Sequence, residues 1–291
     1  MKILKSLNLD NVVFLDIETT KAEKELTAES PLWEAWKYKC THGRESLNLA
    51  TSYEWQAAFD KEASLFAEFG KIACITIGKI KDARLSLKSY ASFDEAELLN
   101  NFCRDLNNIV AANKNTVLCG HAIKGFDIPW LMRRCLVNRI ELPVLLDNAH
   151  LKPWEQTAVD TAELWKAGGF NGASLISITT ALGLTNPKDE LEGCEVSATY
   201  YSGAPNALEL ITTYCEKDVL AVANVVRVIR GEEVVTAGKK ELKEAVAAGG
   251  PLERSYKTGK LTKEDGSRIT KNLKEVTDQK LAEEILKVAI K

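Results

Sequence analysis

Two acidic residues stand two positions apart after an apolar run near the N-terminus. Asp16 and Glu18 follow residues 12–15 (VVFL), a run that predicts a buried strand whose last residues turn polar. Side chains two apart on a strand point to the same face, so both carboxylates could reach one ion. The same pattern can also mark the place where a strand meets solvent, so the pair indicates chemistry only in the company of other ligands.

A third acidic residue, Asp127, opens a predicted helix. It comes directly after Phe126, at the end of the short apolar strand predicted for residues 116–121. The free amide groups at a helix N-terminus favour a carboxylate there. Asp is also a common N-terminal cap, so a purely structural role is the alternative at this position.

A tyrosine and a fourth acidic residue lie on the strongest predicted helix, residues 207–230. Tyr214 and Asp218 are four positions apart and therefore stack on one helix face beside the apolar stripe. A lone carboxylate is costly to bury there. The spacing also fits a surface Asp beside a core Tyr.

Together these residues predict a cation site. Carboxylates within ~4 Å of one another repel by roughly 1 kcal/mol per pair in water and by more when partly desolvated, so a cluster of them needs cations. Oxygen ligands without His or Cys prefer Mg²⁺ or Mn²⁺, and two such ions ~4 Å apart form the clamp used for in-line phosphodiester hydrolysis. The residue types of Asp16, Glu18, Asp127 and Asp218 fit that chemistry.

Hydrophobic periodicity predicts the elements that position these residues. After the first strand, the alternating residues 71–80 and 83–90 predict an antiparallel hairpin. Helices are predicted from about residue 94 to 113, over 127–138, over 174–184 and over 207–230. This order of elements predicts an α/β fold with a mixed five-stranded sheet and helices on its faces.

Residues 21–66 form a polar insertion after the first strand that is too aromatic for a disordered loop. The favoured interpretation for Trp33, Trp36 and Trp55 is a small buried core, although one or two aromatic side chains could stack on single-stranded bases. The insertion belongs to one predicted catalytic domain, residues 1–237.

The remaining residues, 238–291, differ in composition. They begin as a basic linker rich in Gly and Lys and regain a weak helical pattern from residue 273, which predicts a C-terminal docking helix. This tail holds 13 Lys or Arg and 9 Asp or Glu, a net charge of +4, which leaves −7 for residues 1–237. Residues 1–237 are too acidic to bind duplex DNA non-specifically by counterion release, so we expect any contacts with nucleic acid to be local.

Composition excludes several classes of protein. An apolar fraction of 45% and a charged fraction of 27% are ordinary for globular proteins and argue against fibrous or disordered chains. The apolar runs are far shorter than the ~20 residues needed to cross a bilayer, so we expect no membrane contact. The seven cysteines form no CxxC pair and the three histidines are scattered, which argues against zinc. No secretion signal is evident, so a cytoplasmic location is expected, and no protein partner can be inferred.

In combination, the motifs resemble the DEDD family of 3′→5′ exonucleases, tyrosine subtype, which have the ribonuclease H-like fold. The resemblance rests on DIE at 16–18, FD at 126–127 and YCEKD at 214–218, in the order and spacing of that family. The segments HAIKGFDIPWL, SLISITTALGL, NPKDELEG and FGKIACITIG resemble stand-alone relatives of the proofreading exonuclease domain of family B DNA polymerases. The resemblance covers most of the predicted catalytic domain.

The resemblance implies a role for each matching residue. The metal ligands would be Asp16, Glu18, Asp127 and Asp218. Tyr214 would orient the attacking water. The main chain near Ile17 and Thr19 would hold the terminal 3′ hydroxyl group, and Phe126 would border the terminal base.

One position departs from the family pattern. Relatives usually have Asn where this chain has Ala122, so a ligand to substrate or water is missing there. His121 beside it is a candidate substitute, the alternative being a histidine that only satisfies its structural surroundings.

The expected function is removal of nucleotides from single-stranded or frayed DNA 3′ ends by two-metal phosphodiester hydrolysis. One alternative keeps the site and changes the substrate to RNA, because ribonucleases of the same superfamily use the same carboxylates. The other is a non-catalytic nucleic-acid-binding module that retains the fold, which Ala122 and the basic tail would favour.

Overall fold

The computed structural model describes residues 5–42, 49, 51–81, 84–152, 155–185, 193–235 and 252–257, the last of these as main chain only. The predicted C-terminal helix and nearly all of the NPKDELEG motif lie outside the described residues.

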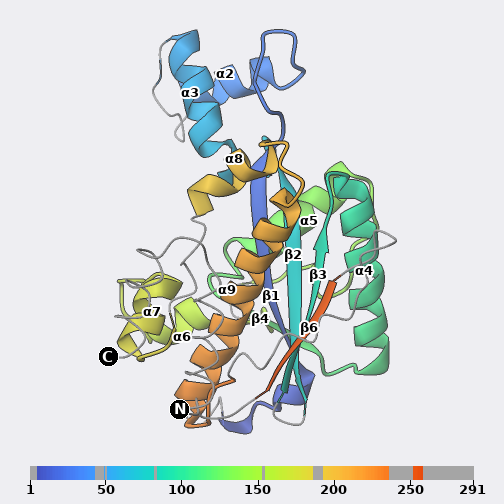
Figure 1. Cartoon of the computed structure of the whole chain (residues 1–291), viewed down its shortest axis with the longest axis vertical. Coiled ribbons are helices and arrows are strands. Elements are labelled where there is room, and N and C mark those ends of the chain that lie inside the picture. The colour runs from blue at the N-terminus through green and yellow to red at the C-terminus, as the bar shows by residue number, and fades with distance from the viewer. Residues whose placement is uncertain are drawn as a thin grey trace, which may run out of the picture.

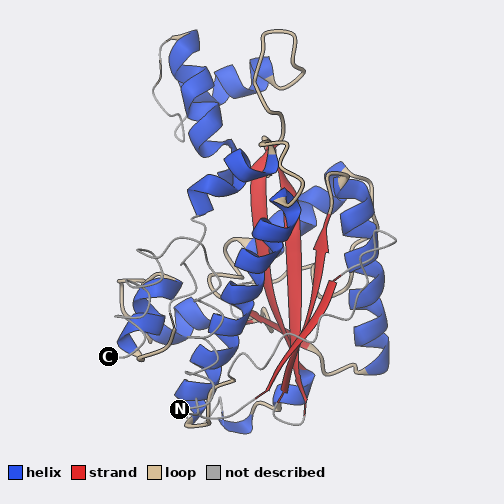
Figure 2. Cartoon of the chain, in the orientation of Figure 1, coloured by secondary structure: helices blue, strands red, loops and turns tan. Residues whose placement is uncertain are grey.

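A mixed sheet forms the centre of the molecule, with helices on both faces (Figures 1 and 2). Its strand order is β5-β4-β1-β2-β3-β6. The central strand β1 (Val12–Lys21) pairs antiparallel with β2 (Gly70–Lys81) and parallel with β4 (Val117–Gly120). β3 (Arg84–Ala91) completes the predicted hairpin with β2, and β5 (Val159–Asp160) pairs parallel with β4.

Strands β1 to β5 confirm the expected mixed sheet, and a further strand extends it. β6 (Leu252–Lys257) pairs antiparallel with β3 at the edge of the sheet. This segment lies within the tail that was predicted to be a linker, so the linker prediction is wrong for these 6 residues. This mostly polar edge strand (LERSYK) lacks the apolar alternation by which a strand is recognised.

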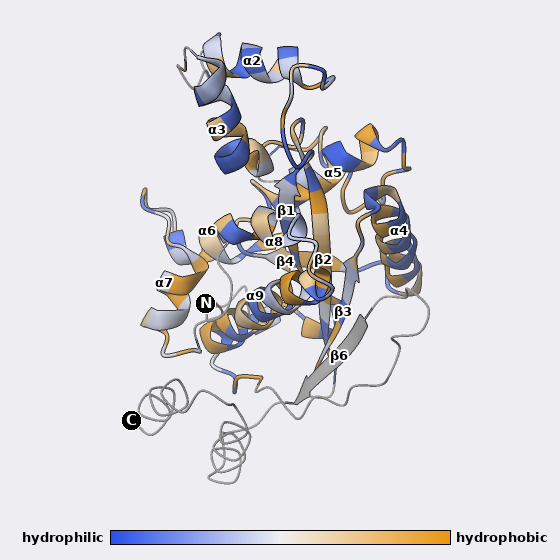
Figure 3. Cartoon of the chain, turned by 45° about the horizontal axis from the view of Figure 1, so that its top comes forward, coloured by the Kyte–Doolittle hydropathy of each residue, from blue (hydrophilic) through white to orange (hydrophobic). Residues whose placement is uncertain are grey.

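Two helices cover one face of the sheet. α4 (Glu95–Ala112) begins where Asp94 accepts hydrogen bonds from two main-chain N–H groups, as the sequence predicts, and α5 (Asp127–Val137) begins at the candidate ligand. Phe102 of α4 and Leu131 of α5 belong to one buried cluster that also contains Leu15 and Ile17 of β1. Hydrophilic and hydrophobic residues lie on different sides of these helices (Figure 3).

α9 (Ala207–Arg230) crosses the opposite face and contacts β1, β2 and β3 (Figure 1). Val219 and Val222 pack against Phe14, and the helix ends, as predicted, at Gly231 in the left-handed conformation (φ 77°). A Cβ atom at Gly78 of β2 would lie 2.9 Å from the side chain of Val219. Glycine therefore permits the close approach of α9 to the sheet.

Shorter helices complete this face. They are α6 (Thr161–Lys166), α7 (Leu175–Ala181) and α8 (Val196–Tyr200), together with the 3₁₀ turns η1 (Leu9–Asn11) and η3 (Gly193–Glu195). Within the described part of the chain, no helix has the length and apolar character needed to cross a membrane.

The insertion folds around a core of its own. It contains α2 (Trp33–Thr41), α3 (Ser52–Glu62) and the turn η2 (Ala63–Leu65). Trp36 is fully buried and contacts the rings of Phe59 and Phe69 edge to face, with ring centroids 5.3 and 4.9 Å apart. Trp33 and Trp55 are half-buried and contact each other edge to face at 5.9 Å. The tryptophans therefore support the prediction of a small buried core.

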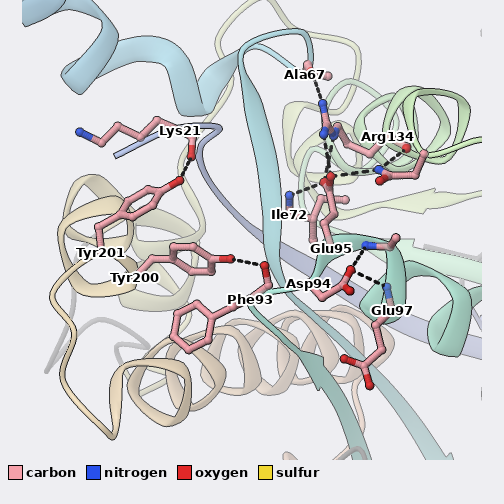
Figure 4. A network of polar contacts seen from close by, with 12 residues as sticks. Lys21, Ala67, Ile72, Phe93, Asp94, Glu95, Glu97, Arg134, Tyr200 and Tyr201 are labelled. Atoms are coloured by element: carbon pink, nitrogen blue, oxygen red, sulfur yellow. Dashed lines mark hydrogen bonds and ion pairs between the residues drawn. The ribbon is translucent and has the colours of Figure 1, made fainter. Parts of the chain in front are cut away.

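A buried ion pair joins the segment just before β2 to the sheet and to both helices of the α4 and α5 face (Figure 4). Arg134 of α5 and Glu95 of α4 lie 2.6 Å apart, and each is at most 8% exposed. Glu95 also accepts from the N–H of Ile72 at 2.7 Å, while Arg134 donates to the carbonyl of Ala67 at 2.8 Å. Because every charge has hydrogen-bonded partners, removal of one side chain would leave the other buried and uncompensated.

Candidate active site

Asp16 and Glu18 lie in the middle of β1, not at its end. The sequence predicted that the strand stops near Asp16, but β1 continues to Lys21, with an irregularity between Glu18 and Thr19. One carboxylate oxygen of each residue and the Sγ atom of Cys215 all lie within 4.8 Å of one another. The prediction that both carboxylates share a face is therefore confirmed.

Asp127 is held against β1 by its own hydrogen bonds. Its side chain is 3% exposed, and its carboxylate accepts from its own N–H and from that of Ile17, the residue between Asp16 and Glu18. Burial raises the pKa of Asp127 to about 7, because the hydrogen bonds only partly offset the lost hydration and the charges of Asp160 and Asp218 add repulsion.

Asp218 of α9 faces the same point from the opposite layer. Burial is the first cause that raises the pKa of Asp16 well above its usual range, and the charges of Asp218, Glu18 and Asp127 add to it in that order. Electrostatic repulsion of this kind requires proximity. The charges of all four carboxylates selected from the sequence thus interact, and among the described residues Asp16 and Glu18 are the two whose oxygens share a group of ligand atoms within 4.8 Å of one another.

Tyr214 lies one helical turn before Asp218 and is 5% exposed. Burial, followed by the charges of Glu18, Asp218 and Asp16, raises the pKa of its phenol far above the ordinary value. The hydroxyl group therefore stays protonated at neutral pH and can donate a hydrogen bond beside the carboxylates.

Cys215 also belongs to this cluster, although no chemistry was expected of it from the sequence. Its thiol donates to the carbonyl oxygen and to Oδ2 of Asp16, both at 3.4 Å. Burial raises the pKa of the Cys215 thiol well above its usual value, so the thiol remains a neutral donor. Its side chain therefore packs against Asp16 and acts there as a weak hydrogen-bond donor.

The donor set fits divalent cations. The four carboxylates come from β1, α5 and α9, and the pKa values of Asp16 and Asp127 are raised first by burial and then by the charges of neighbouring carboxylates. Hard oxygen ligands of this type suit Mg²⁺ or Mn²⁺, which would remove the repulsion.

Asp160, which the sequence analysis missed, fixes the loop that leads to Asp127. Its Oδ1 atom accepts from the N–H groups of Ala122 and Ala162, both at 2.9 Å, and Oδ2 accepts from Lys124 at 3.2 Å. The side chain is 4% exposed. An Asp before a short polar helix predicts an N-terminal cap, which Asp160 is for α6, but this local signal says nothing of its bonds to the loop after β4.

The departure at Ala122 has a conformational consequence. Ala122 adopts the left-handed conformation (φ 55°), which is strained for a residue with a Cβ atom. His121 beside it makes two protein contacts: Nδ1 lies 3.1 Å from Oγ1 of Thr161, and the ring hydrogen-bonds the main chain of Ala173. Burial lowers the pKa of His121, so the ring is neutral at pH 7. These contacts support the structural interpretation, although the ring also lines the cavity of the site.

The cavity has a volume of about 340 Å³. It is bordered by Asp16, His121, Ser174, Leu175, Ile176 and Asp218. Its walls thus join the carboxylate cluster to the start of α7.

The other predicted substrate residues lie close to the ligands. Thr19 donates from Oγ1 to the carbonyl of Ser64 at 2.7 Å, which ties β1 to the insertion. Phe126, directly before Asp127, is half-buried with its ring 5.8 Å from that of Trp130. The main-chain N–H of Ile17 is used by Asp127. Contacts of these residues with substrate stay predictions.

Comparison with known proteins gives one family. A family model described as the RNase_H superfamily matches residues 57–230. The match includes β2 to α9, and with them Asp127, Tyr214 and Asp218, while β1 lies before it. None of the curated proteins compared matches the chain.

Proposed function

The chain belongs to the RNase_H superfamily, and on this premise we propose that it is a metal-dependent 3′→5′ exonuclease acting on single-stranded or frayed DNA 3′ ends. The superfamily supports a nuclease that binds nucleic acid. The observation that carries the finer proposal is the convergence of Asp16, Glu18, Asp127 and Asp218 beside a protonated Tyr214.

The four carboxylates would hold two divalent cations, Mg²⁺ or Mn²⁺. When bound, such ions lower the pKa of an attacking water and stabilise the leaving 3′ oxygen. Because Asp16 and Asp127 retain protons at higher pH than ordinary carboxyl groups, ion binding must be linked to their deprotonation.

Tyr214 acts in this proposal as a hydrogen-bond donor. Its raised pKa excludes a phenolate at neutral pH, so it does not remove a proton from water. A protonated hydroxyl group fixed on α9, one turn from Asp218, can orient a water or a phosphate oxygen. Loss of the hydroxyl group should therefore slow the reaction without abolishing metal binding.

Cavity size and charge support the substrate class. A volume of about 340 Å³ lies at the lower end of ligand pockets and suits a single terminal nucleotide. The acidic body does not favour a duplex bound along its length, because that mode needs many basic phosphate contacts. A free 3′ end that enters the cavity needs few.

RNA is the second candidate substrate, because the described site does not exclude a 2′ hydroxyl group. The second motif, which resembles that of polymerase proofreading domains, favours DNA. A non-catalytic binding module is less well supported, since loss of activity would be expected to show as loss of ligands and all four carboxylates are present.

The test is hydrolysis of 5′-labelled single-stranded DNA and RNA in Mg²⁺, Mn²⁺ or EDTA. We expect a ladder that shortens from the 3′ end and disappears with EDTA. Asp218→Ala should abolish it, while Glu209→Ala, an exposed acidic residue on the same helix, should not. Intact turnover by Asp218→Ala would remove Asp218 from the mechanism, and degradation of RNA alone would reverse the substrate.

A further inference from the structure

The loop between α6 and α7 projects an aromatic side chain into solvent. The side chain of Phe170 is 100% exposed, and Trp165 at the end of α6 is 38% exposed. Aromatic side chains normally stabilise a fold by burial, which Phe170 does not provide. Single exposed apolar residues are common, so the position of Phe170 must carry the argument.

Both ends of this loop are anchored. On one side, the N–H of Ala167, in the left-handed conformation, donates to the carbonyl of Glu163 at 3.1 Å and ends α6. On the other side, the ring of His121 hydrogen-bonds the main chain of Ala173. The projecting part between these anchors is short, and Phe170 lies within it. His121 thus acquires a role: it fixes the far end of the loop.

The loop leads directly into the wall of the active-site cavity. Ser174, Leu175 and Ile176 follow it in the chain and line the cavity, which is bordered on its other sides by Asp16 and Asp218. Phe170 therefore lies four residues before Ser174, which lines the cavity in which a terminal nucleotide would bind. This continuity distinguishes Phe170 from exposed aromatics elsewhere, such as Tyr53 of α3, which is 80% exposed.

Charge also favours this side of the site for a polyanion. From residue 164 to residue 185 the chain contains no Asp or Glu, and Lys166 is its only charged residue. The first 237 residues carry a net charge of −7. A nucleic-acid strand that approaches over this loop meets less repulsion than one that approaches over the carboxylates.

We propose that residues 167–173 form a stacking platform for single-stranded nucleic acid whose 3′ end occupies the cavity. The inference rests on the proposed function and names how that site holds its strand. Phe170 offers a ring face to a base upstream of the terminal nucleotide, and Lys166 offers a charge to the backbone. Stacking on an aromatic ring is tolerant of base sequence, so the platform serves any single strand.

The first test compares two substrates. One is a short oligothymidylate, and the other is the p-nitrophenyl ester of thymidine 5′-monophosphate, which has no upstream nucleotide. Phe170→Ala should raise KM for the oligonucleotide roughly tenfold and leave kcat/KM for the ester unchanged. Phe170→Trp should retain the wild-type KM, and Tyr53→Ala is the matched exposed control. An unchanged KM in Phe170→Ala, or an equal loss on the ester, would overturn the platform.

The second test separates the platform from the exonuclease. Binding of fluorescently labelled oligothymidylate is measured by anisotropy in EDTA, where no turnover is expected. If the wild type hydrolyses neither substrate with any metal, the exonuclease proposal fails, yet a roughly tenfold weaker Kd for Phe170→Ala still supports the platform. Equal affinities of the two proteins, or no binding by the wild type, would reject the platform even where hydrolysis is observed.

Discussion

The carboxylate of Asp127 accepts a hydrogen bond from the main-chain N–H of Ile17, the residue that separates Asp16 from Glu18. This bond ties the first turn of α5 to the central strand between the two residues that supply half of the proposed ligands. The position of the Asp127 carboxylate relative to the main chain of Asp16 and Glu18 is thus set by a main-chain group, which moves less than a side chain does. Preorganisation of this kind is what a metal site needs from its scaffold.

Asp127→Asn should separate stability from activity. The amide oxygen can still accept a hydrogen bond from Ile17, but the side chain carries no charge. Because a buried charge is removed, the free energy of unfolding of the metal-free protein at pH 8 should rise by about 1 kcal/mol or more. Hydrolysis should fall by at least about 100-fold. Denaturant unfolding in EDTA and single-strand hydrolysis measure the two effects. A destabilised Asp127→Asn protein would mean that hydrogen bonding outweighs the charge.

Stability without metal should decrease as pH rises. The pKa of Asp127 is about 7 in the folded protein and lies near the usual Asp value when unfolded, so its contribution is fully present below about pH 4 and is lost as pH rises through 7. Asp16 is shifted in the same direction. Divalent cations should reverse the loss, so Mg²⁺ should raise Tm more at pH 8 than at pH 5.5. Thermal unfolding measures these changes in Tm. Equal increases at the two pH values would contradict the linkage between ion binding and deprotonation.

Asp160→Asn should weaken the site through the loop after β4. The carboxylate accepts three main-chain hydrogen bonds. Asparagine keeps one acceptor oxygen and has an NH₂ group in place of the other. This NH₂ group, a donor, would face either the N–H group of Lys124 or those of Ala122 and Ala162. We expect a loss of about 1–3 kcal/mol in the free energy of unfolding and a lower kcat. Asp147→Asn, at an exposed position, is the matched control. Wild-type stability in Asp160→Asn would show that the loop does not depend on it.

Long periodic elements could be predicted from the sequence, and short or irregular ones could not. α9 has the predicted bounds, residues 207–230, because its apolar stripe persists over many turns. β5 consists only of Val159–Asp160 and gives no periodic signal. β1 continues through Asp16 to Lys21, where polar residues interrupt the apolar run but pairing with β2 keeps the chain extended. Tertiary pairing overrides local pattern at both places.

The candidate site shows the same division. The four carboxylates and Tyr214 could be selected because motif spacing encodes them. Asp160 and Cys215 could not, because their partners, Ala122 and Asp16, are far away in the sequence and the residue types have ordinary local explanations. His121 was selected for proximity to a motif, while its contacts with Thr161 and Ala173 are visible only in the folded chain.

Ala122→Gly should stabilise the protein. Ala122 has φ 55°, a conformation that costs an L-residue with a Cβ atom about 1 kcal/mol and costs glycine little. The free energy of unfolding should rise by about 1 kcal/mol, measured by urea denaturation. The stability of Ala57→Gly, at an exposed position in the middle of α3, should fall by a similar amount, because glycine is unfavourable in a helix interior. A loss of stability in both variants would show that the loop gains nothing from a relaxed main chain.

Gly78→Ala should act on the site from the other side of α9. The added Cβ atom would lie 2.9 Å from Val219 and 3.0 Å from Leu87, so α9 must shift away from β2. Overpacking of this kind costs about 1–3 kcal/mol of stability. Since Val219 adjoins Asp218, the shift should also weaken Mg²⁺ activation, seen as a higher Mg²⁺ concentration at half-maximal hydrolysis. Gly172→Ala, where a Cβ atom meets no neighbour within 4 Å, should leave stability unchanged. If Gly78→Ala lowers stability while the Mg²⁺ dependence stays as in the wild type, the packing of α9 on β2 does not set the position of Asp218.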